Sequence, residues 1–119
     1  MIERYEIMNS DLHSIVVEKC ERLLRKEHRD HEEIIRFLQD AADPYAIPFL
    51  EQAVLLKPSL EYLSYDDYGA YYKKCFWALR AIGTTEAVEV IEQFAVSDDP
   101  IIKEQARYRL SKIAKPIES

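Results

Sequence analysis

The sequence predicts an all-α protein with a single domain. Apolar residues recur three and four positions apart along the chain, and the alternation typical of strands is absent. Only two glycines, Gly69 and Gly83, occur in 119 residues, so few positions favour an interruption of helix. A chain of this length is expected to bury one hydrophobic core. We therefore expect one all-α domain over residues 1–119.

Each expected helix begins at a residue whose side chain can accept hydrogen bonds from free backbone amides. Asp43 and Asp99 are each followed by proline, which is favoured at the first helical position. Asp30 has a glutamate three positions later, as in a capping box. The other starts are expected at Ser10 or Asp11, at Asp66 or Asp67, and at Thr84. These signals predict six helices, over about residues 11–27, 31–41, 44–56, 67–82, 85–97 and 100–114.

The chain contains an internal repeat. The segment AIPFLEQ at residues 46–52 aligns with AVEVIEQ at residues 87–93, a shift of 41 positions. The helices that follow align with a shift of 31, which places Ala78-Leu79 opposite Arg109-Leu110. The first helix pair therefore has a connection about ten residues longer than the second. The extra length lies between Leu55 and Gly69, in a segment rich in tyrosine.

Residues 77–113, WALRAIGTTEAVEVIEQFAVSDDPIIKEQARYRLSKI, resemble the HEAT-like repeats of the phycocyanobilin-lyase type. Ala78-Leu79, Ile82-Gly83 and Ala87-Val88 fit the family pattern of a helix end, a short turn and an Ala-hydrophobic helix. The resemblance extends more weakly to about Leu38, and Tyr72 stands where the family usually has arginine.

The resemblance implies a short α-α superhelix (α-solenoid) of about three HEAT-like helix pairs, at about residues 11–41, 44–82 and 85–114. The first helix of each pair would lie on the convex side, and the second helices would line the concave side. Such repeats serve more often as binding scaffolds than as enzymes.

Helical periodicity of about 100° per residue predicts which side chains leave the core. Lys73, Trp77 and Arg80 lie opposite the packed arc of their helix, which is formed by Tyr71, Cys75, Ala78, Leu79 and Ile82. The last helix is expected to expose Glu104, Tyr108 and Ser111 and to bury Ile102, Ala106, Leu110 and Ile113. Arg36, Trp77 and Tyr108 would then form a row of residue types common at protein interfaces. Alternatively, Trp77 is covered by the stems of Lys73 or Arg80 and by the neighbouring repeat.

The tyrosine-rich segment is a second candidate interface. Aromatic rings and carboxylates there would suit a basic partner; they belong to Glu61, Tyr62, Tyr65, Asp66, Asp67 and Tyr68. In the alternative, Leu60, Leu63 and some of the tyrosines fold back onto the core, and Asp66 or Asp67 only caps a helix.

Composition restricts the classes of partner. Sixteen basic and 22 acidic side chains give a net charge of −6, which repels phosphate backbones and favours cationic partners, so nucleic acid is not expected. No uncharged stretch reaches the roughly 18 residues that a membrane span needs. The N-terminus has no apolar signal-peptide centre, so we expect a cytoplasmic protein without membrane contact.

No motif for catalysis, a metal or a cofactor is recognised. The segment KEHRDHEE, which contains His28 and His31, is expected to be a solvated turn rather than a metal site. Cys20 and Cys75 follow apolar spacing and are expected to be buried as free thiols.

These observations favour a non-enzymatic protein-binding module. The leading hypothesis is an inhibitor of the immunity type that masks a basic toxin or effector domain. The alternative is a HEAT-repeat scaffold or adaptor that holds a peptide or helix in its concave groove. An enzyme like the HEAT-like lyases or the helical-repeat DNA glycosylases is the third hypothesis, and the latter would need a basic concave surface.

Overall fold

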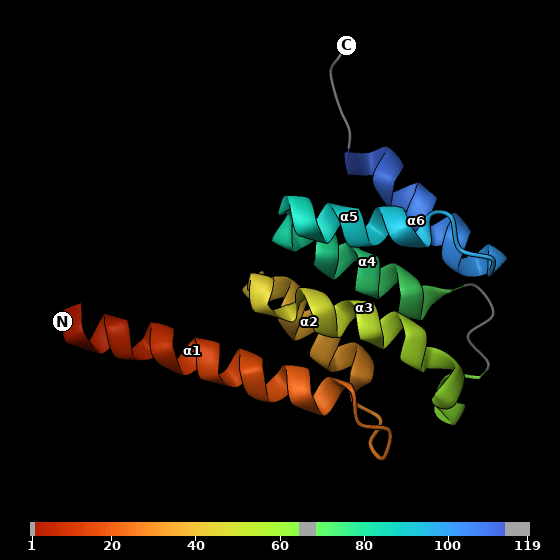
Figure 1. Ribbon diagram of the computed structural model, residues 1–119. Helices are drawn as coiled ribbons and strands as arrows, with labels where there is room; N and C mark the ends of the chain where they lie inside the picture. The colour runs from red at the N-terminus through yellow and green to blue at the C-terminus, as the bar shows by residue number, and fades with distance from the viewer. Residues whose placement is uncertain (1, 65–68, 114–119) are drawn as a thin grey trace, which may run out of the picture.

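The protein contains six α-helices in the part of the chain that the structure, a computed structural model, describes (Figure 1). This part comprises residues 2–64 and 69–113, and of residues 2–10 only the helical backbone is described. The helices are α1 (Ile2–Leu23), α2 (His31–Ala41), α3 (Ile47–Leu56), α4 (Ala70–Ile82), α5 (Thr85–Phe94) and α6 (Pro100–Ile113). Three short 3-10 segments, η1 (Pro44–Ala46), η2 (Lys57–Ser59) and η3 (Glu61–Leu63), complete the order. The expectation of an all-α fold is confirmed, since no strand occurs in these residues.

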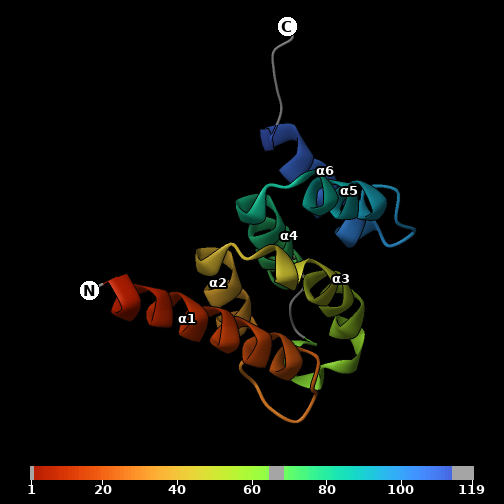
Figure 2. The ribbon, with the colours of Figure 1, turned by 60° about the vertical axis from the view of Figure 1, so that its left-hand side comes forward.

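The helices lie in two layers. Successive helices pack in pairs, α1 on α2, α3 on α4 and α5 on α6. Helix α4 also packs against α2, α5 and α6, while α3 contacts α1 and α5 (Figures 1 and 2). One layer therefore consists of α1, α3 and α5, and the other of α2, α4 and α6. The Cα extents of 50 × 45 × 17 Å agree with two layers, because packed helices lie roughly 8–10 Å apart.

The core lies between these layers. Tyr71 and Phe76 of α4 are fully buried, and the Tyr71 hydroxyl donates a hydrogen bond of 2.9 Å to the carbonyl oxygen of Ala53 in α3. Cys20 and Cys75 are buried and free, as the sequence predicted. Burial raises the pKa of the Cys20 thiol to about 12 and also raises the pKa of the Cys75 thiol. Both cysteines therefore stay protonated and act as apolar core residues.

Three of the expected N-caps are confirmed by side-chain hydrogen bonds. Asp43 accepts from the amide of Tyr45, Thr84 from that of Ala87, and Asp99 from that of Ile101. The capping box at Asp30 is wrong, although α2 does begin at residue 31. The Asp30 carboxylate accepts a hydrogen bond from Arg22 of α1 instead, and this bond holds its pKa below the usual value.

The largest difference from the expected boundaries concerns α1, which spans residues 2–23 rather than 11–27. Neither proline nor glycine interrupts residues 2–10, so the helix continues through the expected start at Ser10 or Asp11. After Leu23 the chain turns, and the imidazoles of His28 and His31 bond to the carbonyl oxygens of Arg22 in α1 and of Arg25 in the turn. Asp43 caps η1, and the α-helix that follows it, α3, begins at Ile47 rather than residue 44. Helix α4 begins at Ala70 rather than residue 67, after Gly69 in a left-handed conformation, and α5 ends at Phe94 rather than residue 97.

The longer connection lies where the repeat alignment placed it. Residues 57–69 join α3 to α4, whereas residues 95–99 join α5 to α6. Leu60 and Leu63 are buried against the core, so the folding-back alternative is confirmed for these two side chains. The predicted site residues Tyr65, Asp66, Asp67 and Tyr68 lie outside the described residues.

Candidate functional site

The face formed by α2, α4 and α6 carries the expected row of Arg36, Trp77 and Tyr108. All three side chains are exposed, Trp77 by 37% and Tyr108 by 49%. Arg36 and Trp77 line one hollow of about 210 Å³ together with Gln39 and Lys74. Trp77 and Tyr108 line a second hollow of about 390 Å³. Trp77 therefore lies between the other two residues of the row.

The second hollow, called here the α4–α6 pocket, is basic and aromatic. Its lining contains four cations, two aromatic rings and no carboxylate. The residues are Lys73, Trp77 and Arg80 of α4 and Tyr108, Arg109 and Lys112 of α6.

The cations of this pocket lie against its aromatic rings. The Arg109 guanidinium carbon lies 4.0 Å from the centroid of the Trp77 ring, and that of Arg80 lies 5.3 Å from it. On the other side of the pocket, Lys112 Nζ lies 5.3 Å from the Tyr108 ring. Trp77 is thus partly covered, as the alternative hypothesis expected, but the covering residue of the neighbouring helix is Arg109. Such contacts are favourable because the face of an aromatic ring is electron-rich.

No carboxylate of the described residues neutralises the positive charges of the α4–α6 pocket. Among the described residues, none of its four cations forms an ion pair. Arg109 is only 4% exposed, yet its guanidinium donates no hydrogen bond to a described residue. Other cations of the same face are paired, because Arg36 bonds to Asp40 at 3.5 Å and Lys74 to Glu32 at 3.3 Å.

Burial of an unpaired charge costs free energy, and the Trp77 ring offsets only part of this cost. The same environment lowers the pKa of Arg109, first through burial and then through the charge of Arg80. A charge kept in such a place is typical of a binding site, where the missing partner is the ligand.

The two layers differ in charge, although the whole chain is acidic. Helix α4 carries three cations and no carboxylate, while α5 carries Glu86, Glu89 and Glu92 and no Lys or Arg. Between α3 and α5 lies an acidic groove of about 320 Å³, without a cation in its lining. The groove is lined by Pro44, Ile47, Pro48, Glu51, Glu86, Glu89, Val90 and Gln93.

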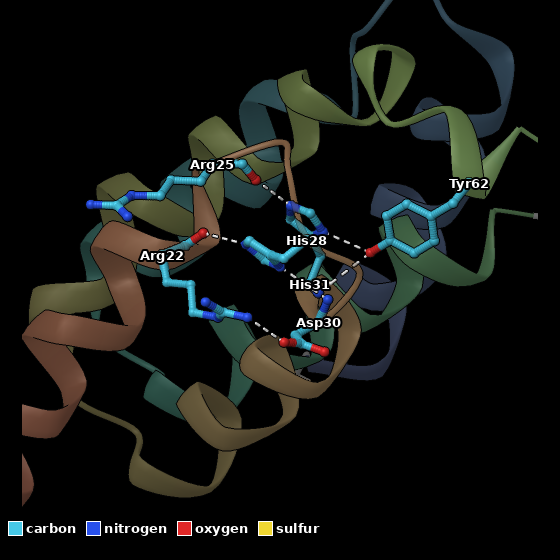
Figure 3. A network of polar contacts seen from close by, with 6 residues as sticks. All are labelled: Arg22, Arg25, His28, Asp30, His31 and Tyr62. Atoms are coloured by element: carbon cyan, nitrogen blue, oxygen red, sulfur yellow. Dashed lines mark hydrogen bonds and ion pairs between the residues drawn. The ribbon is translucent and has the colours of Figure 1, made fainter.

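A network of polar contacts joins the α1–α2 turn to η3 (Figure 3). His31 is fully buried, and its Nε2–H donates to the Arg25 carbonyl oxygen at 2.6 Å. Its Nδ1 accepts from the Tyr62 hydroxyl at 2.6 Å. The expectation of a solvated turn is therefore wrong for His31, because the folded-back connection supplies Tyr62 as a buried partner.

The neighbouring ring belongs to the same network. His28 stacks on His31 with 4.2 Å between ring centroids. Its Nε2–H donates to the Arg22 carbonyl oxygen, and its Nδ1 accepts from the Asp30 amide. All four ring nitrogens are thus bonded to protein groups. Among the described residues, no three His, Cys, Asp or Glu side chains converge as metal ligands would.

Glu61 and Tyr62 are the predicted contact residues of the tyrosine-rich segment that the structure describes. Glu61 is exposed, whereas Tyr62 is half-buried and its hydroxyl is bonded to His31. Both line a hollow of about 260 Å³ of mixed charge beside the α1–α2 turn, together with Lys26, Glu27, His28, Arg29 and Ser59. Tyr62 therefore holds the connection in place and presents only part of its ring to solvent.

Sequence reasoning missed Arg109 as a site residue. In α6, Ile102 and Ala106 are buried as expected, but Arg109 is buried where Leu110 and Ile113 were expected, and these two are half-buried. The repeat alignment contained the signal, because it placed Arg109 opposite Ala78, which is fully buried. The alignment therefore predicts that Arg109 is buried although it is charged.

No protein family, curated protein or solved structure matches the chain. The HEAT-like resemblance therefore stays a prediction. Among the described residues, no helix combines the length and the apolar character needed to cross a membrane.

Proposed function

We propose that this protein is a short HEAT-like α-solenoid that binds a segment of another protein on its α2–α4–α6 face and is not an enzyme. The packing of helices in three pairs and two layers supports the repeat architecture. The single observation that carries the binding function is the exposure of Trp77 and Tyr108 on adjacent helices around one hollow. Aromatic and arginine side chains at such places contribute most of the free energy of many protein interfaces.

The test uses partner capture followed by measurement on the purified complex. Wild type, Trp77→Ala and Tyr45→Ala serve as baits, since Tyr45 is an exposed aromatic residue at the opposite layer and is a matched control. We expect one protein to be retained by wild type and Tyr45→Ala and lost with Trp77→Ala. Its affinity for Trp77→Ala should fall by about 30-fold or more, as is usual for a central aromatic anchor. Equal affinities for all three baits would contradict the proposal.

The acidic groove between α3 and α5 favours a second candidate function, the immunity-type inhibitor of a basic toxin or effector domain. The lining of this groove contains the apolar side chains of Ile47 and Val90. It also contains the carboxylates of Glu51, Glu86 and Glu89, which would attract cations. For such a partner, the double variant Glu86→Gln/Glu89→Gln should slow association at low salt, whereas Trp77→Ala should not. An association rate independent of both salt and these glutamates would exclude this candidate.

A further inference from the structure

We propose that the α4–α6 pocket receives the carboxylates of an acidic segment of the partner, with Arg109 as the principal contact. This inference rests on the proposed function and specifies the chemistry of the segment that the α2–α4–α6 face would bind. The net charge of the chain favours a basic partner, whereas the partner inferred for this face is acidic.

The first step is the state of the pocket in the free protein. Arg109 is more than nine-tenths buried, lines the pocket, and has no hydrogen-bond acceptor among the described residues. Its planar guanidinium has five N–H donors in a fork, and a carboxylate is the group that matches this fork with two parallel hydrogen bonds. A carboxylate that enters the pocket would therefore satisfy donors for which the described residues offer no acceptor.

The second step is the charge around Arg109. Lys73, Arg80 and Lys112 line the same pocket, and none of them is ion-paired with a described residue. These three side chains are exposed, but Arg109 is buried and the charge of Arg80 acts on it, which is unfavourable until a counter-charge arrives. An incoming anion thus relieves their repulsion and gains attraction from all four groups.

The third step separates an acidic peptide from a nucleic acid. The pocket of about 390 Å³ has room for a few side chains, and an exposed carboxylate lies beside it, since Glu104 precedes Tyr108 by one turn of α6. Together with the net charge of −6, this carboxylate would repel a long phosphate backbone that extends beyond the pocket. A short segment of alternating acidic and apolar residues fits better, because Trp77 and Tyr108 offer apolar surface beside the cations.

The pocket contains its own reporter, because Trp77 is the only tryptophan of the chain. The experiment titrates the intact protein with an acetylated and amidated hexaglutamate peptide at constant ionic strength and follows tryptophan fluorescence. We expect a saturable change with hexaglutamate and none with hexaglutamine.

Charge-removing variants locate the site. Lys112→Gln, at an exposed position, should weaken hexaglutamate binding several-fold, and Arg109→Met should weaken it about tenfold or more, since a charge-assisted contact is lost. The matched control is Lys103→Gln, which removes the same charge from α6 outside the pocket and should leave the affinity within about twofold. If Arg109→Met does not fold, Lys112→Gln and Lys73→Gln carry the test.

Three outcomes would overturn the inference. These are no saturable change with hexaglutamate, an equal loss with Lys103→Gln, and binding of inorganic phosphate or of a twelve-residue oligothymidylate more tightly than hexaglutamate. The last outcome would assign the pocket to phosphate groups. The titration is independent of partner capture: capture that is insensitive to Trp77→Ala would contradict the proposed function alone, and a failed titration with Trp77-dependent capture would contradict only the acidic occupant.

Discussion

The hydroxyl of Tyr62 lies 2.6 Å from Nδ1 of His31, although 31 residues of chain separate them. This bond joins the connection between α3 and α4 to the first residue of α2. Burial lowers the pKa of this imidazole and so favours its neutral form, in which Nε2–H donates to the Arg25 carbonyl oxygen and Nδ1 accepts from Tyr62. The connection thereby also holds the turn that follows α1.

The neutral state of His31 predicts a pH dependence of stability. Burial lowers the pKa of this imidazole below its usual value of 6.5, with the nearby charges of His28 and Arg22 acting in the same direction and that of Asp30 and the hydrogen bond to Arg25 opposing it. Below about pH 6.5 the unfolded chain therefore binds a proton that the folded chain does not, so stability falls with falling pH. Denaturant unfolding at pH 7.5 and 5.5 should give the lower free energy of unfolding at pH 5.5.

The control for this prediction is a variant of an exposed histidine. His13→Gln should retain the loss of stability between pH 7.5 and 5.5, while His31→Gln should lose part of it. An unchanged pH dependence in His31→Gln would show that this ring does not titrate as its burial implies.

Removal of one hydroxyl should also be costly. Tyr62→Phe deletes the donor to His31 Nδ1 and leaves a buried acceptor without a partner, which usually costs about 1–3 kcal/mol. Tyr45→Phe is the matched control, because its ring is exposed, and it should change the unfolding free energy by less than about 0.5 kcal/mol. Equal effects in urea titrations would indicate that the Tyr62 bond contributes nothing to stability.

The two glycines should differ in their tolerance of a methyl group. Gly69 and Gly83 have similar left-handed φ values of 74° and 72°, so alanine would be strained at both by about 1–2 kcal/mol. A Cβ on Gly69 would also lie 2.6 Å from Cγ2 of Ile101, whereas the nearest atom at Gly83 is 3.4 Å away. We expect Gly69→Ala to be less stable than Gly83→Ala by at least about 1 kcal/mol. Thermal unfolding of both variants at one pH measures this difference. Equal melting temperatures would mean that Ile101 of α6 moves aside without loss of stability.

Arg109 should matter less for stability than its burial suggests. Because its charge is buried without an ion-pair partner in residues 2–64 and 69–113, Arg109→Met removes a desolvation cost along with the contact to Trp77. The free energy of unfolding should stay within about 1 kcal/mol of wild type or rise, whereas Leu79→Ala, at a fully buried apolar position, should lose about 2–5 kcal/mol. Chemical denaturation compares the two. A loss of the size seen with Leu79→Ala would identify Arg109 as a structural residue.

Local signals explain what could be predicted. The caps at Asp43, Thr84 and Asp99 each act within three residues, and helical periodicity alone places Trp77 and Tyr108 on exposed positions. The repeat alignment located the longer connection between α3 and α4, because the change of shift from 41 to 31 positions can be read from the sequence alone. The start of α1 was predicted wrongly, because the capping residues Ser10 and Asp11 lie inside a helix that neither proline nor glycine interrupts.

The sequence by itself thus determined that the protein is helical, where α2, α5 and α6 begin and which side chains of α4 face solvent, since these depend on the order of neighbouring residues. Only the tertiary structure decided that Arg109 lies buried on the Trp77 ring and that His31 is paired with Tyr62. Both contacts join residues about 30 positions apart, and their energies depend on how the helices pack. Packing also decides which charge loses its water without gaining a counter-ion.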